Sequence, residues 1–496
     1  EAAKVTAEKS AQAAKVAAEK SAQIAKAAAQ AAAIPIQENN MNDQVERFID
    51  SKKDDIIRSV QESIRFPSVE AEPAGPGAPF GSAVKGALEH ALELGRSFGF
   101  ETENLDGYAG CIDYGEGEEM LGVVCHVDVV PEGEGWSYPP YAAEIADGKI
   151  FGRGAMDDKG PAICAIYALA AIKEAGLAMK RRVRIILGTN EETGWGCMNH
   201  YKEVAEIPTM SISPDAEYPL VNSEKGIYHS TWRCKAKTGF RIDGGTRANV
   251  VCGKAKVFIP LAKEEVEKAL PVVYEHGMSA ELAPKDGGTE LTIIGLDAHG
   301  SMPEHGKNAM LAAFALLSAL PLSAEDLCVA KLLHEAFKFD THGESIGLDR
   351  EDSSGRLTLN PGVIAWDEEG FELSIDVRHP TGMDYREVRD GIAAALSPLS
   401  PELVHEKQQD GHFIAEETEL VSKLLDVYEK RTGRREKPLA IGGGTYARAF
   451  PNAVAFGCEK AGISGPVHMP NEFIGIDELM FDTHMLADAI IALACK

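Results

Sequence analysis

Apolar residues recur at helical spacing just after residue 41, and further along the chain they gather into short continuous runs. From Val45 to Ile64 they fall on one face of a helix, which Pro67 should end. A longer run at 161–175 opens with a proline, which suits the first turn of a buried helix. The short runs predict buried strands at 121–125, 183–188 and 210–213. This alternation predicts an α/β fold with a mixed, mainly parallel sheet covered by helices.

The pattern changes between residues 220 and 411, where strand-like segments separate helices less regularly. These segments lie at 227–234, 290–294 and 371–377. Beyond 411 we expect a helix near 420–431, a glycine-rich turn at 442–445, a strand at 453–457 and a closing helix at 479–494. The expected domains are therefore a body made of 41–219 and 412–496, and a large α+β domain, 220–411, inserted into it.

The first forty residues differ from the rest because an alanine-rich segment repeats in them almost unchanged. Residues 2–12 recur at 13–23, and alanine remains abundant up to Ala33. High alanine content and an 11-residue period favour a long helix. We expect 1–40 to form an extra N-terminal helix that is solvated or acts as a tether, rather than binding a partner or taking part in catalysis. Met41 could itself begin a protein, so this segment is expected to be an added extension.

Charge and composition narrow the range of partners. In 496 residues, 77 Asp and Glu outnumber 50 Lys and Arg, and the formal charge of -27 repels phosphate backbones and anionic lipids. The longest apolar stretch, 162–172, is too short to cross a bilayer. Nine single cysteines without a C-x-x-C pair, and no signal peptide, fit a reduced protein. We therefore expect no nucleic-acid or membrane partner, and a cytoplasmic location.

Polar side chains follow three of the predicted strands. His126 and Asp128 come after the first strand, Glu191 and Glu192 after the second, and Asp215 after the third. In open α/β sheets, ligands bind at the carboxyl ends of the strands. An imidazole beside a carboxylate suits a metal ligand with its hydrogen-bond partner, although such a pair alone is more often a solvated strand end. The recurrence of polar side chains at three strand ends favours a binding site.

Three further candidates lie outside these strand ends. Asp157 and Asp158 sit in a glycine-rich loop, and His468 lies far downstream. By itself the loop is also typical of a helix N-terminal turn, where aspartates complement the helix dipole. Imidazoles together with several carboxylates suit a pair of borderline divalent ions that share one bridging carboxylate. The residues therefore point to a dinuclear metal site.

Taken together, these motifs resemble the M20 family of dinuclear metallopeptidases. The matching residues are His126-x-Asp128-Val129-Val130-Pro131, Trp136, Gly152-Arg153-Gly154, Asp157-Asp158-Lys159-Gly160, Glu191-Glu192, Ser213-Pro214-Asp215-Ala216-Glu217 and His468. The resemblance extends from about Met41 to the end of the chain. Within the family the chain is most similar to the PepV-type bacterial dipeptidases, because the large insert and the segment from Gly442 to Arg448 also match.

The resemblance implies a role for each residue of the metal site. His126, Asp157 and Asp215 would hold one ion, and Glu192, His468 and the bridging Asp157 would hold the other. Asp128 would orient His126, and a cis peptide bond is implied next to Asp157. Glu191 would be the general base, which takes a proton from the metal-bridged water and passes it to the leaving amine. We expect two divalent ions, with zinc first and manganese or cobalt as alternatives.

In the inserted domain the resemblance implies a lid that carries further site residues. Asn249 would contact the substrate, His299 would stabilise the oxyanion, and Arg378 would bind the substrate carboxylate. The loop residues Gly442, Gly443, Gly444 and Thr445 would offer backbone N–H donors to the same carboxylate. Without the family, ordinary loop polarity would be the better explanation of Asn249 and His299.

The expected function is metal-dependent hydrolysis of dipeptides by a monomer. Other M20 enzymes use nearly the same ligands, so the alternatives are an N-acyl amino-acid deacylase, an acetylornithine or succinyl-diaminopimelate deacylase, or a carboxypeptidase. A binding protein derived from a retired enzyme would lack catalytic groups, whereas every expected ligand and Glu191 are present here.

Overall fold

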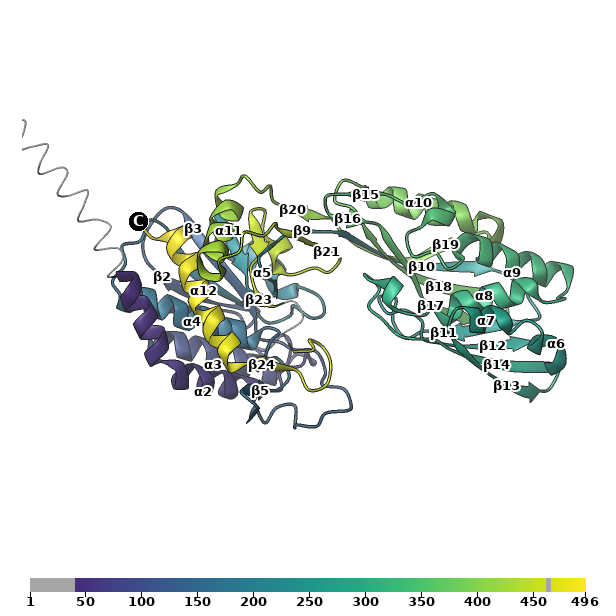
Figure 1. Ribbon diagram of the computed structural model, residues 1–496, viewed down its shortest axis with the longest axis horizontal. Helices are drawn as coiled ribbons and strands as arrows, with labels where there is room; N and C mark the ends of the chain where they lie inside the picture. Colours follow the sequence, from purple (N-terminus) through teal and green to yellow (C-terminus); the bar gives the residue numbers. More distant parts are fainter. Residues whose placement is uncertain (1–40, 461–464) are drawn as a thin grey trace, which may run out of the picture. The chain divides into compact units, whose positions relative to one another are not determined.

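The computed structural model describes residues 41–460 and 465–496, so the predicted helix at 1–40 lies outside the described residues. The chain forms two compact units (Figure 1). Unit 1 contains the residues up to Tyr218 with Asp426–Arg435 and Phe456–Lys496, and unit 2 contains Pro219–Leu425 and Glu436–Ala455. The chain enters unit 2 where the inserted domain was expected to begin. Residues 412–425 and 436–455, which we expected in the body, cluster with unit 2.

The first amphipathic helix forms in two pieces. Residues 41–51 are helical, a turn follows at Lys52, and α2 spans Lys53–Ile64. The apolar positions that predicted the helix, such as Ile49 and Ile56, are fully buried. The helix therefore ends before Pro67, as the pattern predicted.

Unit 1 contains a mixed sheet in which adjacent strands follow the order β1-β2-β6-β3-β7. The bounds are β1 Glu101–Leu105, β2 Ala109–Tyr114, β3 Met120–His126, β6 Arg182–Gly188 and β7 Met210–Ser213. β3 runs parallel to both β6 and β7, while β1 and β2 are antiparallel. Every residue of β3 is buried, as expected of a parallel strand covered on both faces. In the register of the sheet, His126 at the end of β3 pairs with Gly188 at the end of β6.

Helices cover both faces of this sheet. Ile112 of β2 packs beneath α3 (Ser82–Ser97), while the next residue, Asp113, binds Arg184 on the side of α5 (Gly196–Val204). Successive strand residues point to opposite faces, so α3 and α5 lie on opposite sides. α4 (Lys159–Glu174) is buried all round and lies along α12 (Ile476–Ala494), drawn in yellow in Figure 1.

A small antiparallel sheet joins the C-terminal segment to the first half of unit 1. Its order is β24-β5-β4, with β24 Phe473–Gly475, β5 Lys149–Phe151 and β4 Glu144–Ala146. Phe473 pairs with Phe151, and their ring centroids are 5.5 Å apart. This pairing places the residues before β24 beside the glycine-rich loop that follows β5. A short parallel pair, β8 (Ala216–Glu217) with β23 (Cys458–Glu459), also belongs to unit 1.

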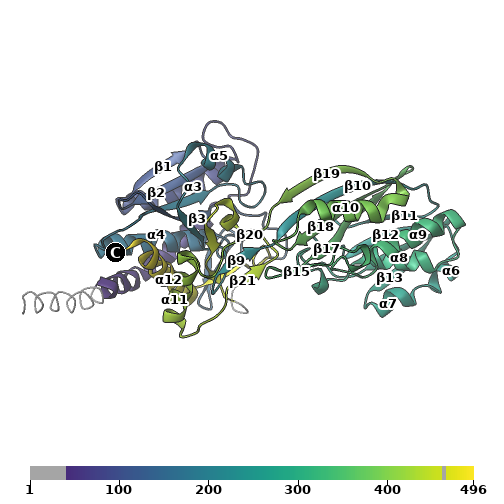
Figure 2. The ribbon, with the colours of Figure 1, turned by 90° about the horizontal axis from the view of Figure 1, so that it is seen from above.

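Unit 2 is built on an eight-stranded antiparallel sheet of order β13-β14-β12-β11-β17-β18-β10-β19. Its strands are β10 Gly226–Lys235, β11 Arg241–Gly244, β12 Lys254–Ile259, β13 Ser279–Lys285, β14 Gly288–Ile294, β17 Thr358–Trp366, β18 Gly370–His379 and β19 Glu402–Gln409. Burial alternates along β10, as expected of a strand with one face on a core. Helices α8 (Ala309–Ala319), α9 (Ala324–Phe337) and α10 (Tyr385–Leu396) form a layer on that face (Figure 2).

The remaining elements are short or connect these parts. They are α6 Lys263–Glu267, α7 Pro271–Glu275, α11 Glu419–Thr432, β9 Val221–Glu224, β15 Glu351–Asp352, β16 Gly355–Arg356, β20 His412–Phe413, β21 Leu439–Ile441 and β22 Ala453–Ala455, with short 3-10 turns at Pro303–His305, Glu344–Ile346, Ser397–Leu399 and Tyr446–Ala449. β9 pairs with β20, β21 and β22, which draws the glycine-rich turn after β21 into unit 2.

The predicted fold class is confirmed: an α/β unit with a mixed, helix-covered sheet accompanies an α+β unit. The strand-like segments 227–234, 290–294 and 371–377 lie within β10, β14 and β18. All nine cysteines are within the described residues, and none forms a disulfide. Within residues 41–460 and 465–496, no helix is both long and apolar enough to cross a membrane.

Candidate dinuclear metal centre

Five predicted ligands come together in unit 1 as two groups that share one residue. The first ligand group is His126, Asp157 and Asp215, and the second ligand group is Asp157, Glu192 and His468. Within each group the ligand atoms lie within 4.8 Å of one another. The parallel strands explain this arrangement, because His126 ends β3, Glu192 follows β6 and Asp215 follows β7 at one edge of the sheet.

The ring orientation of His126 suits a metal ligand. Its Nδ1 lies 2.9 Å from the backbone carbonyl oxygen of Asp128. A carbonyl oxygen only accepts, so Nδ1 donates its hydrogen, and Nε2 is the nitrogen that faces the ligand group. Nε2 lies 2.8 Å from Asp157 Oδ1 and 3.7 Å from Asp215 Oδ2, inside the first ligand group.

Asp157 has the geometry of a bridging carboxylate. Its Oδ1 faces His126, whereas its Oδ2 lies 2.8 Å from His468 Nε2. His468 Nε2 is also 3.1 Å from Glu192 Oε2, which closes the second ligand group. The peptide bond between Asp157 and Asp158 is cis, as the family resemblance implied.

Asp158 takes a different part from its neighbour. Its side chain is fully buried, and its Oδ2 accepts a hydrogen bond from the backbone N–H of His126 at 2.9 Å. Asp158 therefore supports the end of β3, and only Asp157 belongs to the ligand groups.

His468 occupies an unusual backbone conformation. Its φ angle is 61°, in the left-handed region that residues other than glycine adopt uncommonly. Such conformations persist where the surrounding structure enforces them, and they cluster at functional sites. The side chain is about half exposed, at 52%, whereas His126 is buried. The second ligand group is therefore the one that opens to solvent.

The charges of the site fit cations. Burial raises the pKa of Glu191, Glu192 and Asp215, and the charge of Asp157 raises each further. Burial disfavours a charged His468, yet its hydrogen bonds to Asp157 and Glu192 outweigh this and raise its pKa to about 11. Crowded carboxylates thus draw positive charge onto the imidazole rings. Divalent ions would supply that charge, and imidazole nitrogens with carboxylate oxygens are ligands that such ions accept.

Asp128 connects two of the loops that carry the site. Its carboxylate oxygens accept the backbone N–H groups of Glu191 and Glu192, each at 3.1 Å. Its Oδ1 lies 3.5 Å from His126 Nδ1, farther than its own carbonyl oxygen. The residue holds the imidazole mainly through its backbone and uses its side chain to fix the loop after β6.

Sequence reasoning quoted Arg153 as part of a motif without giving it a role, and it did not single out Glu472. Glu472 has no exposed surface, and its carboxylate pairs with the buried guanidinium of Arg153. Neither residue lies in a ligand group, so no metal-ligand spacing pointed to them. An arginine inside the glycine-rich loop and a glutamate four positions after His468 were the available signals.

The predicted lid residues form two smaller groups in unit 2. Asn249 and His299 lie on adjacent backbones, because the carbonyl oxygen of Asn249 accepts the N–H of Gly300 at 2.7 Å. His299 Nδ1 lies 2.6 Å from Ser301 Oγ. Arg378 donates from Nη1 to the carbonyl oxygen of Gly442 at 2.9 Å, so the predicted arginine and the glycine-rich loop meet.

A buried carboxylate supports each of these lid elements. Asp376 has no exposed surface, accepts from Arg378 Nε at 3.1 Å, and lies 2.7 Å from His229 Nε2. A Cβ added to Gly300 would lie 2.5 Å from Asp376 Oδ2, so the loop of His299 packs against the same carboxylate.

Glu224 anchors the other end of the glycine-rich loop. The Thr445 hydroxyl donates to Glu224 Oε1 at 2.7 Å, and Arg448 Nε donates to Oε2 at 2.6 Å. The Thr445 N–H also points to Glu224, at 3.2 Å from Oε2. Thr445 is thus engaged within the protein, whereas Gly442 and Gly443 are the loop residues whose carbonyl oxygens accept from arginines.

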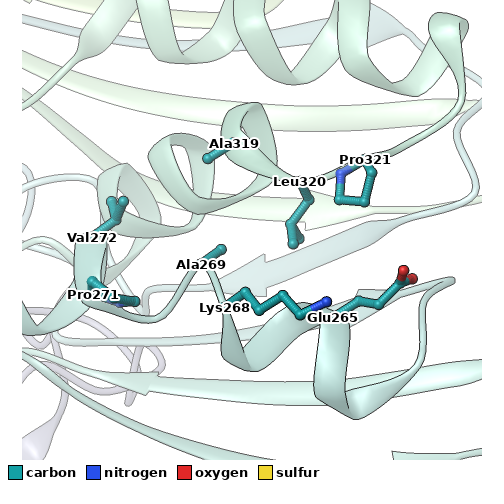
Figure 3. Close-up of a pocket in the computed structure, with 8 residues that line it drawn as sticks. All are labelled: Glu265, Lys268, Ala269, Pro271, Val272, Ala319, Leu320 and Pro321. Carbon is teal, nitrogen blue, oxygen red and sulfur yellow. The ribbon is translucent and has the colours of Figure 1, made fainter.

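Unit 2 also contains a pocket of about 290 Å³ (Figure 3). Its lining residues are Glu265, Lys268, Ala269, Pro271, Val272, Ala319, Leu320 and Pro321. No predicted site residue lines it, so it is not the candidate site.

Comparison with known proteins places the chain in a family. Residues 122–492 match Peptidase family M20/M25/M40. The chain is 39% identical to "Putative dipeptidase YtjP" of Bacillus subtilis (strain 168), over 92% of this chain and 100% of the relative. It is 32% identical to "Beta-Ala-Xaa dipeptidase" of Lactobacillus delbrueckii subsp. lactis, over 90% of this chain and 97% of the relative. The solved structure of human carnosine dipeptidase 1 has a similar fold, with a TM-score of 0.56, 15% identity, and coverage of 91% of this chain and 98% of that one.

The fold, the paired ligand groups and these matches together define a peptide-bond hydrolase. The chain belongs to Peptidase family M20/M25/M40. The matched segment contains all five candidate ligands, from His126 to His468.

Proposed function

We propose that the protein hydrolyses dipeptides with the help of two divalent ions held by the two ligand groups. The observation that carries this proposal is the shared Asp157, whose two carboxylate oxygens face His126 and His468 respectively. Relatives named as dipeptidases, which align over nearly their whole length, support a short peptide as substrate. Zinc is the first candidate ion, with manganese and cobalt as alternatives.

Ions bound there would polarise the scissile carbonyl and acidify a water molecule, so no protein nucleophile is required. Glu191 acts as the general base, accepting the proton of the attacking water and delivering it to the leaving amine. Two features support this role. The Glu191 backbone N–H donates to Asp128 at 3.1 Å, and burial together with neighbouring carboxylates raises the pKa of Glu191, which makes its carboxylate a stronger base.

The residues of unit 2 recognise the peptide. Arg378 binds the C-terminal carboxylate, because a guanidinium fixed at Nε by Asp376 and at Nη1 by Gly442 still has N–H groups to offer a ligand. Backbone N–H groups of the glycine-rich loop assist it. Asn249 contacts the substrate, and His299 stabilises the oxyanion.

The ligands alone do not distinguish a dipeptidase from a deacylase or a carboxypeptidase. Substrate preference does distinguish these three activities. Purified protein reconstituted with zinc should be compared on Ala-Ala, β-alanyl-alanine, N-acetyl-Ala-Ala and Ala-Ala-Ala. We expect kcat/KM for the free dipeptides to exceed that for the blocked or longer peptides by at least about tenfold. Preference for the N-acetylated peptide would overturn the proposal in favour of a deacylase, and efficient cleavage of the tripeptide would favour a carboxypeptidase.

We also propose that the enzyme works as a monomer in the cytoplasm. The absence of any disulfide among its nine cysteines is compatible with a reducing compartment. Sedimentation of the purified protein and fractionation of cells that express it test the two statements.

A further inference from the structure

One buried ion pair lies among the loops that carry the metal ligands without belonging to them. Glu472 has no exposed surface, and Arg153 is 1% exposed. Arg153 Nη1 donates to Glu472 Oε2. The two residues are far apart in sequence, and the pairing of β24 with β5 brings their segments together.

Glu472 holds the loop that contains the bridging ligand. Its Oε1 accepts the backbone N–H groups of Gly154 at 3.0 Å and Met156 at 3.1 Å, and the N–H of Asp157 lies at 3.4 Å. The backbone carbonyl oxygen of Glu472 accepts from the N–H of Gly152 at 2.9 Å. A single residue therefore fixes the loop from both its side chain and its main chain, directly before Asp157.

Arg153 extends this connection to a third loop. Its Nη2 lies 3.4 Å from the carbonyl oxygen of Glu132 and 3.5 Å from that of Pro131. The guanidinium also lies over the Trp136 ring, 5.4 Å from its centroid. These residues continue the loop that begins with His126 and Asp128, so the ion pair touches all three segments that carry His126, Asp157 and His468.

The position of the Arg153–Glu472 ion pair indicates a role beyond stabilising the fold. Removing two charges from water is costly, and buried pairs can often be replaced by apolar residues without loss of stability. In this ion pair the second carboxylate oxygen of Glu472 accepts two backbone N–H groups. It therefore fixes the orientation of the loop before Asp157, which an apolar pair could not do. Residues outside the metal ligands that hydrogen-bond the ligating loops commonly tune metal affinity.

We propose that Arg153 and Glu472 are positioning residues that set the separation between Asp157 and His468, and with it the affinity of the second ligand group for its ion. This inference rests on the proposed function, since it takes the two groups to be metal sites. The first ligand group depends less on the pair, because His126 is fixed by Asp128 and Asp158 independently.

The test is metal binding by Glu472→Gln, measured by calorimetric titration of the metal-free full chain with zinc. The amide keeps an oxygen for Gly154 and Met156 but loses the charge that faces Arg153. We expect the weaker of the two zinc affinities to fall by about 10- to 100-fold, with the tighter one changed less than about threefold. Raising the zinc concentration should restore kcat without a change in KM.

Asp113→Asn is the control, because it removes the charge of a carboxylate that pairs with an arginine elsewhere in unit 1. Asp113 accepts from Arg184 Nε at 2.7 Å and touches no ligand loop. We expect it to lower the unfolding temperature while both zinc affinities stay as in the wild type.

Arg153→Lys serves as a second variant if Glu472→Gln does not fold. It keeps the charge for Glu472 but loses the fork that reaches Glu132, so an intermediate loss of zinc affinity is expected. The inference is overturned if either folded variant binds two zinc ions as tightly as the wild type. The proposed function fails separately, if wild-type protein loaded with two ions leaves dipeptides intact.

Discussion

The candidate ligand groups of unit 1 and the proposed recognition residues of unit 2 are held in place in different ways. In unit 1 the ligands touch one another: Asp157 lies 2.8 Å from each of two imidazoles. In unit 2 the residues touch their supports instead, as Arg378 does with Asp376 and Gly442. Metal ligands must lie close enough to one another to share an ion, whereas a recognition group must keep hydrogen-bond donors available for a substrate. Substitutions in the two regions should therefore have different effects on metal binding and on substrate binding.

The largest effect is expected for Asp157→Ala, which removes the ligand common to both groups. Neither group keeps three ligands, so we expect fewer than one bound ion per chain and hydrolysis at the uncatalysed rate. Metal analysis after dialysis, together with a dipeptide assay, checks this. Asp477→Asn, at a fully exposed side chain, is the control and should bind metal normally. Two ions retained by Asp157→Ala would contradict the bridging geometry.

Glu191→Gln should separate catalysis from metal binding within unit 1. The substitution removes the base but none of the ligands, so we expect kcat to fall by about 10² to 10⁴-fold while two ions remain bound. The comparison variant, Glu192→Gln, changes the neighbouring ligand and should also lose metal. Equal metal loss in both variants, or an unchanged kcat in Glu191→Gln, would show that Glu191 is not the general base.

Arg378→Lys probes the recognition group. Lysine keeps a charge but cannot bind Asp376, Gly442 and a carboxylate at the same time, so we expect kcat/KM for Ala-Ala to fall by about 10- to 100-fold, with metal content unchanged. The same measurement on Ala-Ala amide, which lacks the carboxylate, should show almost no difference between variant and wild type. An equal loss on both substrates would mean that Arg378 acts through the fold.

The smallest effect concerns Asp376 and pH. Burial opposes its charge, but Arg378 and His229 outweigh this and lower the pKa of Asp376. A carboxyl whose pKa is lower in the folded state stabilises the fold above its unfolded pKa, near pH 4, and this contribution is lost as pH falls through the folded value. Asp376→Asn should therefore lower the unfolding temperature of the metal-free protein most at neutral pH, and less as the pH falls below about 4. A loss of unfolding temperature that does not change with pH would contradict a stabilising role for the Asp376 charge.

The sequence predicted which residues of unit 1 the structure brings together, because local rules apply to most of them. Apolar runs marked the parallel strands, and the carboxyl ends of parallel strands meet at one edge, which brings His126, Glu192 and Asp215 together. His468 is different, since no local pattern connects it to these strands. Only the family resemblance indicated that the chain returns to the same edge.

Other features depended on pairings that a linear pattern cannot show. The glycine-rich loop clusters with unit 2 because β21 pairs with β9, and the sequence of β21 does not specify that partner. The supports of the site escaped notice for a similar reason. Glu472 binds backbone N–H groups, which every residue except proline has, so no residue type marks the loop that it binds.

The position of His468 and Glu472 near the end of the chain sets an order of events during synthesis. A ribosome that has released residue 215 has already exposed the whole of the first ligand group, while the second still lacks its histidine and the glutamate that steadies Asp157. The order of the ligands along the chain therefore makes the second ligand group the last part of the site to be completed.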